Sequence, residues 1–237
     1  MTVVIKGIAH RGYMAKYPEN TLSSFDAACR LSFSLVEMDV HLSKDGVPIV
    51  MHDATLKRTC GVEGYVKDYT VAELKQFRVL ETETIPTLEE ALRCIKGRST
   101  ALIELKKADG VSYEGLEQRV LDQARVLGMS DQIVLSSFHG DLLERVRELS
   151  DRTAISVLLD GDLDKELIVR VRARYVSVGP SFVNDANVKW CRDRDVQLIT
   201  RGVNSEERMQ LFARYPTLMA STNELELWKQ YYERNLL

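Results

Sequence analysis

Short apolar runs alternate with amphipathic segments along most of this chain. The apolar runs have the length of strands and cover 3–9, 35–41, 101–105, 133–138, 154–159, 175–178, 196–200 and 217–220. Between them, apolar residues recur at helical spacing over 20–31, 87–96, 113–128, 141–149, 164–173, 185–194, 205–214 and 224–233. Strands that alternate with helices are typical of a parallel sheet, because each helix returns the chain to the edge where the next strand starts. The pattern predicts eight such units.

The number of units decides which parallel fold to expect. Eight strand–helix units close into a TIM (β/α)8 barrel, which commonly takes roughly 250 residues, and this chain has 237. We therefore expect an α/β fold with a single barrel domain over residues 1–237. A further apolar run at 47–51 and a more polar stretch at about 54–80 predict a small insertion after the second strand. A doubly wound open sheet is the alternative, and it would hold the polar strand ends farther apart.

Composition and charge are those of an ordinary globular protein. Hydrophobic residues make up 45% of the chain, which is enough for a large core. The net charge is −3 and acids are mixed with bases, so the chain lacks the basic surface that binds nucleic acid. No apolar run approaches the roughly 20 residues that span a bilayer. We expect a small-molecule substrate and no stable membrane insertion, and the sequence leaves the oligomeric state open.

Cysteine usage and the N-terminal segment bear on the cellular compartment. The cysteines are scattered without a CxxC pair, which argues against a zinc knuckle or a redox motif. They are Cys29, Cys60, Cys94 and Cys191. Reduced structural cysteines are typical of a reducing compartment. The segment 1–6 lacks the basic and long apolar regions of a signal peptide. We expect a cytoplasmic protein.

Polar side chains stand where several of the predicted strands end. They are His10 and Arg11 in the first run, Glu37 and Asp39 in the second, His52 after the run at 47–51, and Glu104 and Lys106 in the next. The carboxyl ends of parallel strands share one face of a barrel, so these groups should meet there. Side chains alternate along a strand, so Glu37 and Asp39 point the same way. Their buried carboxylates would repel each other unless a cation is bound between them.

This set of residue types predicts chemistry on a phosphate ester. Three carboxylates bind a hard divalent cation, and a cation beside Lys106 and Arg11 binds a phosphate. The two histidines, His10 and His52, are then free to move protons. The alternative for the whole set is a buried salt-bridge network, in which His10 is a hydrogen-bonded core residue and His52 belongs to a simple turn.

Other polar residues have local interpretations. We interpret His41 and His139 as structural or rim residues. The segment 18–21 offers caps for the first helix and shapes the loop that positions His10. Thr87, followed by Glu90 three residues later, has the spacing of a capping box at the start of a helix.

The same residues resemble the glycerophosphodiester phosphodiesterase family. The resemblance is dense from residue 5 to residue 106 and is carried by HRG, PENT, ExD, KDGVP, HD, IPTLEE and ELK, in that order. The segment 136–138, Ser-Ser-Phe, is similar to the fourth strand of the family. The resemblance implies a TIM barrel with a small insertion after the second strand. It also implies hydrolysis of glycerophosphodiesters to glycerol 3-phosphate and an alcohol.

The resemblance further implies a role for each matching residue. Glu37, Asp39 and Glu104 would hold one divalent cation, Ca2+ or Mg2+. His10 and His52 would be the general acid and the general base, in an order that the sequence leaves open. Arg11 and Lys106 would hold the phosphate.

The last third of the chain departs from the family pattern. Arg201 stands at the end of the seventh strand, where family members usually carry a Trp, and Asn223 replaces the Asp of a Thr-Asp pair. We expect Arg201 to contact the substrate headgroup and to favour an anionic one. The alternative is that Arg201 pairs with a local acid such as Glu206 or Glu207.

Three other functions remain open at the level of the sequence. A phospholipase D-like barrel enzyme acting on lysophospholipids would use the same histidines and metal, and would need an apolar rim for lipid chains. A catalytically silent barrel that binds phosphate ligands would not need both histidines and all the carboxylates. A metal-dependent phosphomonoesterase would usually need ligands for two cations.

Overall fold

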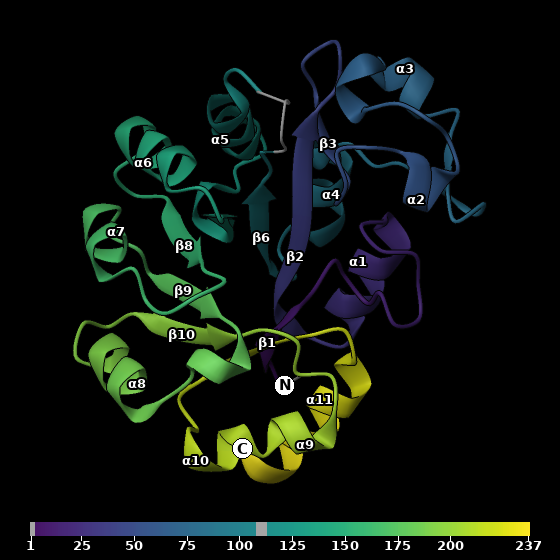
Figure 1. Ribbon diagram of the computed structural model, residues 1–237. Coiled ribbons are helices and arrows are strands. Elements are labelled where there is room, and N and C mark those ends of the chain that lie inside the picture. The colour runs from purple at the N-terminus through teal and green to yellow at the C-terminus, as the bar shows by residue number, and fades with distance from the viewer. Residues whose placement is uncertain (1–2, 108–112) are drawn as a thin grey trace.

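The computed structural model describes residues 3–107 and 113–237, and in them eight parallel strands close into a barrel (Figure 1). Around the barrel the order is β1, β11, β10, β9, β8, β7, β6 and β2, and β2 pairs with β1 to close the ring. The predicted TIM barrel is confirmed. The strands are β1 (Ile5–Ala9), β2 (Phe33–Leu42), β6 (Thr100–Leu105), β7 (Ile133–Ser137), β8 (Ala154–Leu158), β9 (Tyr175–Val178), β10 (Gln197–Thr200) and β11 (Met219–Thr222).

Helices cover the outside of the barrel (Figure 1). The helix α4 illustrates why they form where they do, because its N-cap Thr87 and its third residue Glu90 make the capping box expected from their spacing. Its apolar face is fully buried against the strands. The outer helices are α1 (Leu22–Arg30), α4 (Leu88–Ile95), α5 (Leu116–Val126), α6 (Gly140–Leu149), α7 (Lys165–Arg170), α8 (Asp185–Arg192), α9 (Glu206–Met209), α10 (Leu211–Arg214) and α11 (Leu225–Asn235), with short 3-10 turns η2 (Ser130–Gln132) and η3 (Pro180–Phe182).

The structure shifts the bounds of several predicted elements by a few residues, and in two of them the local structure differs from the expected one. The segment 205–214 is divided at Gln210 into two short helices, and Met209 and Phe212 are buried on either side of it. Gln210 keeps helical backbone angles, but the Ala213 N–H bonds to the Gln210 carbonyl three residues back, so the α-helical hydrogen-bond pattern is interrupted there. The last strand begins at Met219 rather than at Thr217. The carbonyl of Thr217 accepts side-chain hydrogen bonds instead of joining the ladder.

Side chains inside the barrel form layers. An apolar layer of Ile8, Leu35, Leu102, Val134, Ile199 and Met219 fills the middle. Toward the carboxyl ends of the strands, the register aligns Asp39 with Glu104, Glu104 with Ser136, and Ser136 with Ser156. A polar row therefore lies above an apolar layer, on the side where the active sites of such barrels lie.

The insertion after β2 has its own small core. The strand β3 (Pro48–Val50) pairs antiparallel with β2, and the chain then forms short elements before α4. These are α2 (Lys57–Cys60), η1 (Val66–Asp68), α3 (Val71–Leu74), β4 (Arg78–Val79) and β5 (Glu83–Thr84). Seven buried side chains hold them together: Ile49, Met51, Leu56, Val66, Leu74, Val79 and Ile85. This core fixes the loop that carries His52.

Two general expectations can be compared with the described residues. Among residues 3–107 and 113–237, no helix is long and apolar enough to cross a membrane. All the cysteines are free thiols, and Cys29 and Cys191 are buried. The absence of a disulfide pair fits their scattered positions in the sequence.

Candidate active site

The carboxylates of Glu37, Asp39 and Glu104 meet inside the mouth of the barrel. Each offers an oxygen, and these oxygens lie within 4.8 Å of one another. One oxygen of Glu37 accepts the Arg11 backbone N–H at 2.7 Å, while Oε1 is buried and has no hydrogen-bond partner in the described part of the chain. A buried oxygen without a partner, beside two more carboxylates, fits a hard cation with oxygen ligands.

The electrostatics of this cluster also call for a counter-charge. Burial and the neighbouring charges of Asp39 and Glu104 raise the pKa of Glu37 well above its usual range. Burial and the Asp39 charge raise the pKa of Glu104 to about 7. Burial would also raise the pKa of Asp39, but the Lys106 ammonium and the Arg11 guanidinium outweigh it and lower that pKa. Two of these carboxyls are thus held away from ionisation by burial and by the charges beside them.

Two cationic side chains complete the charged cluster. Lys106 Nζ lies 2.8 Å from Oδ1 of Asp39 and 2.5 Å from Oε1 of Glu104. Arg11 Nε lies 3.4 Å from Oδ2 of Asp39. Arg11 has a positive φ of 53°, and the following Gly12 has 75°, so the chain turns sharply out of β1 at this point. The turn brings the Arg11 side chain back over the carboxylates.

His10 and His52 both line the hollow at this mouth, and each is oriented by a different partner. Nδ1 of His10 lies 2.8 Å from Oδ1 of Asn223, and Nδ1 of His52 lies 2.6 Å from Oδ1 of Asp53. Both acceptors fix a proton on Nδ1, which leaves Nε2 of each ring as the nitrogen that can accept a proton. Burial and the Arg11 charge lower the pKa of His10.

An ion-pair network joins the two halves of the site. Arg58, from the insertion, donates to Asp53 at 2.5 Å and to Glu19 at 2.7 and 2.9 Å. Glu19 also binds Arg11 at 3.2 Å. The insertion is therefore tied to the turn after β1 through side chains. Nothing in the sequence pattern around Arg58 indicated this contact, since Arg58 lies on an ordinary polar stretch.

The interpretation of segment 18–21 as a helix cap was only partly right. Thr21 is indeed the N-cap of α1. Asn20, however, is buried and binds Asp39 twice, since its Nδ2 donates to Oδ2 at 2.8 Å and its Oδ1 accepts the Asp39 N–H at 3.3 Å. Nothing in the sequence distinguished Asn20 from an ordinary residue beside a helix cap.

His41 belongs to the support of the site. It is buried, donates from Nε2 to the backbone carbonyl of His52 at 3.0 Å, and accepts the Tyr113 hydroxyl at Nδ1 over 2.7 Å. Burial lowers the pKa of His41 to about 4. His139 is the residue before α6 and is not among the side chains that line the hollow.

The hollow at the mouth has a volume of about 370 Å³. Small serines form part of its wall, where Ser136, Ser177 and Ser221 line it. The buried hydroxyls of Ser136 and of its neighbour Ser156 have no hydrogen-bond partner among the described residues. Small side chains on these strands leave the space that a substrate group needs, and the hydroxyls offer it hydrogen bonds.

Arg201 lies at the end of β10, the seventh strand of the barrel, and lines the same hollow. Its Nη2 lies 2.8 Å from Oδ1 of Asp160 and 2.7 Å from the carbonyl of Leu159. Its guanidinium lies over the Phe138 ring, 4.9 Å from the centroid. An acid does pair with Arg201, but the choice of Glu206 or Glu207 was wrong, because Asp160 reaches it from the neighbouring loop after β8.

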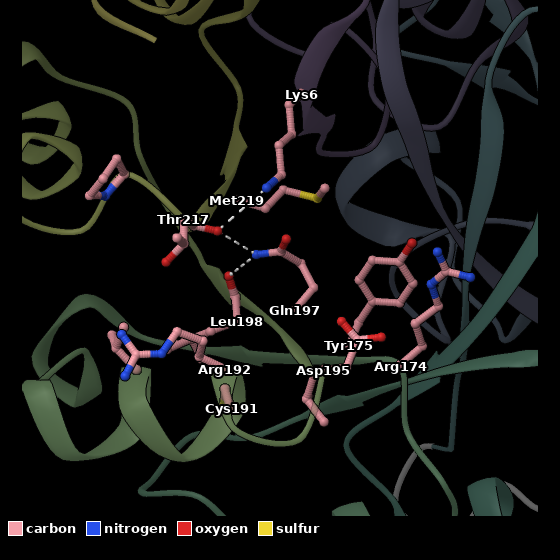
Figure 2. Close-up of a pocket in the computed structure, with 13 residues that line it drawn as sticks. Lys6, Arg174, Tyr175, Cys191, Arg192, Asp195, Gln197, Leu198, Thr217 and Met219 are labelled. Carbon is pink, nitrogen blue, oxygen red and sulfur yellow. Dashed lines mark hydrogen bonds between the residues drawn. The ribbon is translucent and has the colours of Figure 1, made fainter.

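A second hollow, of about 530 Å³, lies at the opposite end of the barrel (Figure 2). Its walls come from the starts of strands, including Lys6, Tyr175 and Gln197. In Figure 2, Lys6 and Gln197 both point to the Thr217 carbonyl, which accepts their hydrogen bonds at 3.4 and 2.8 Å. Barrel active sites lie at the carboxyl ends of the strands, so the smaller hollow is the candidate active site.

The barrel is closed, and its mouth holds carboxylates, basic side chains and two oriented histidines. These features define the class of this protein, which is that of (β/α)8-barrel phosphodiester hydrolases. The chain belongs to the glycerophosphoryl diester phosphodiesterase family, whose model matches residues 10–226. The resemblance found in the sequence is thereby confirmed.

Individual relatives agree with this assignment. A glycerophosphodiester phosphodiesterase of Caldanaerobacter subterraneus is 31% identical over 213 residues, which cover 86% of this chain and 87% of that protein. One from Bacillus altitudinis is 36% identical over 161 residues, covering 65% of this chain and 66% of the relative. Among solved structures, an Oleispira antarctica phosphodiesterase in complex with the product sn-glycerol-3-phosphate has a TM-score of 0.84 and 27% identity, covering 97% of each chain.

Proposed function

We propose that this protein hydrolyses glycerophosphodiesters to glycerol 3-phosphate and an alcohol, with one divalent cation, Ca2+ or Mg2+, held by Glu37, Asp39 and Glu104. The observation that carries the proposal is the cluster of three carboxylates, each of which offers an oxygen within 4.8 Å of the others, together with a buried Glu37 oxygen that has no hydrogen-bond partner among the described residues. The names of the relatives and the glycerol 3-phosphate bound to the Oleispira structure support the substrate class. When bound, the cation would supply Lewis-acid stabilisation of charge on the phosphate.

Arg11 and Lys106 are proposed to hold the phosphate. Lys106 has three N–H donors, of which Asp39 and Glu104 accept two, so one is left for a phosphate oxygen. Arg11 forms ion pairs with Glu19 and Asp39. These contacts fix the position at which its guanidinium would contact the substrate. Both cations stabilise the charge that gathers on the non-bridging oxygens when phosphorus is attacked.

The two histidines are proposed to move the protons. Asp53 stabilises the positive charge that His52 gains on taking a proton, so we assign His52 as the general base. His10 would then protonate the leaving alcohol as general acid, with Asn223 fixing its ring. None of the serines that line the hollow is hydrogen-bonded to a histidine in the described chain, so the nucleophile is the glycerol 2-hydroxyl or water. Attack by water gives glycerol 3-phosphate directly, whereas attack by the 2-hydroxyl expels the alcohol and forms a cyclic phosphate that a water molecule then opens.

Release of glycerol 3-phosphate tests the proposal. The purified protein is assayed with a panel of glycerophosphodiesters, with and without EDTA, and after adding back Ca2+ or Mg2+. We expect metal-dependent release that the double variant His10→Ala/His52→Ala lacks. If the protein releases choline from lysophosphatidylcholine but does not turn over the glycerophosphodiesters, the phospholipase D-like function would be favoured. Turnover of phosphomonoesters but not of diesters would favour a phosphomonoesterase, and no turnover of any substrate would favour a silent binding barrel.

A further inference from the structure

Opposite the carboxylate cluster, the rim of the hollow carries one ion pair, Asp160 with Arg201. The pair joins the loops after β8 and β10, and its closest atoms are 2.8 Å apart. Both residues line the hollow together with Phe138 and Leu158. Asp160 is 84% exposed and Arg201 is 27% exposed, so the acid faces solvent while the guanidinium is partly enclosed. The strands that carry the pair, β8 and β10, lie away from β2 and β6 in the ring.

The guanidinium of Arg201 is fixed in place by the backbone. Its Nη2 donates to the Leu159 carbonyl as well as to Asp160, and Nη1 lies 3.4 Å from the Ser177 carbonyl. Phe138 supports the flat face of the group. Of its five N–H donors, the Nε–H and one Nη1–H remain for a ligand. In the described part of the chain, Oδ2 of Asp160 accepts no hydrogen bond.

These contacts change what Arg201 can select. A lone guanidinium would favour any anionic headgroup, but the adjacent Asp160 carboxylate cancels its net charge and repels a second phosphate. Instead, the rim presents one positive and one negative group side by side, and each of them can still form hydrogen bonds with a ligand. The complement of such a surface is a ligand that carries both charges within a few bonds of each other.

We propose that this pair is a leaving-group subsite for an amino-acid headgroup, in which Asp160 binds the ammonium and Arg201 binds the carboxylate of a serine esterified to the phosphate. The assignment rests on the proposed function, since it places the headgroup of a glycerophosphodiester. It makes Asp160 and Arg201 specificity-determining residues, and it assigns no part in the bond breaking to either.

Four diesters that share the glycerol phosphate half test the assignment. They are glycerophosphoserine with both charges, glycerophosphoethanolamine and glycerophosphocholine with a cation alone, and glycerophosphoglycerol with neither. We expect kcat/KM of the native protein to be highest for the serine diester, by roughly ten-fold over glycerophosphoglycerol, the usual worth of a hydrogen bond between charged groups.

Variants separate the two charges. Asp160→Asn should lower kcat/KM for the serine and ethanolamine diesters about ten-fold more than for glycerophosphoglycerol, while Arg201→Lys should lower it selectively for the serine diester. Glu206→Gln is the matched control, because this exposed acid is close in sequence to Arg201 and does not line the hollow. Asp160 is largely exposed, so its variant should fold normally.

The outcomes distinguish the two proposals. Turnover of all four diesters at similar rates, or an equal loss with every diester in Asp160→Asn, overturns the headgroup assignment and leaves the proposed function standing. No turnover of any of the four overturns the proposed function and the assignment with it. A serine preference that Asp160→Asn abolishes and Glu206→Gln preserves supports the assignment.

Discussion

Nδ1 of His52 lies 2.6 Å from Oδ1 of Asp53, the next residue in the chain, whereas the ring of His10 has an amide oxygen in the same position. A carboxylate beside an imidazole stabilises the ring once it has gained a proton, and an amide oxygen orients the ring without adding a full charge. We therefore expect His52 to be the better base and His10 the better acid.

This difference predicts how the His10 and His52 variants respond to the leaving group. His10→Ala and His52→Ala should each slow turnover of glycerophosphocholine by roughly 10²–10⁴-fold. With a nitrophenyl ester of glycerol phosphate, whose leaving group needs no proton, His10→Ala should regain most of its activity and His52→Ala should not. Steady-state kinetics with both substrates measures this, and the opposite pattern would exchange the two roles.

The Asn223 partner predicts a pH effect. Burial and Arg11 lower the pKa of His10, and Asn223→Asp would place a carboxylate on its Nδ1–H and raise that pKa. A general acid works below its pKa, so the alkaline limb of kcat against pH should move upward, by roughly one unit. The exposed Asn235→Asp adds the same charge elsewhere and should leave the profile unchanged. An unmoved limb in Asn223→Asp would remove His10 as the acid.

Metal binding should depend on Glu104. Glu104→Gln replaces one of the three proposed carboxylate ligands by a neutral amide, so calorimetric titration should find weaker Mg2+ or Ca2+ binding, and activity should fall in parallel. Glu207→Gln, at an exposed position, should leave both unchanged. Full activity after exhaustive chelation would contradict the cation proposal.

The buried His41 should make folding stability depend on pH. Its pKa is lowered to about 4 from 6.5, so the unfolded chain binds a proton in this range that the folded protein does not. Stability is therefore complete above pH 6.5 and falls as the pH drops toward 4, by about 2 kcal/mol between pH 7 and pH 5. His41→Gln keeps a donor for the His52 carbonyl but does not titrate. Urea unfolding at both pH values, in EDTA, should find the native protein losing about 2 kcal/mol more than the variant, and equal losses would count against this assignment.

The barrel was predictable because strand length and helical spacing repeat clearly along the chain. Glu37, Asp39 and Glu104 were predictable for a related reason, since a carboxylate in an otherwise apolar strand has few explanations. Residues whose side chains contact the site only because of the tertiary fold were not predictable. Asn20 and Arg58 look like ordinary cap and surface residues, and only the fold brings them to Asp39 and Asp53.

Local pattern also failed where tertiary contacts decide the backbone. The helical spacing over 205–214 continues through Gln210, yet the structure divides the segment there into α9 and α10. Likewise Thr217 fits a strand by composition, but its carbonyl is taken by Lys6 and Gln197 side chains, so the ladder starts two residues later. In both places the sequence pattern predicted the right type of element but the wrong bounds.

The hydrogen bond between His10 and Asn223 spans 213 positions of the chain, because β1 and β11 are neighbours in the closed ring. During synthesis His10 therefore leaves the ribosome 213 residues before Asn223, and domains generally fold only once their sequence has emerged. A nascent chain that stops before β11 would carry Glu37, Asp39 and Glu104 but could not align the His10 ring. If His10 is the general acid as proposed, catalysis would begin only when β11 closes the ring, and chains that terminate before β11 would be inactive.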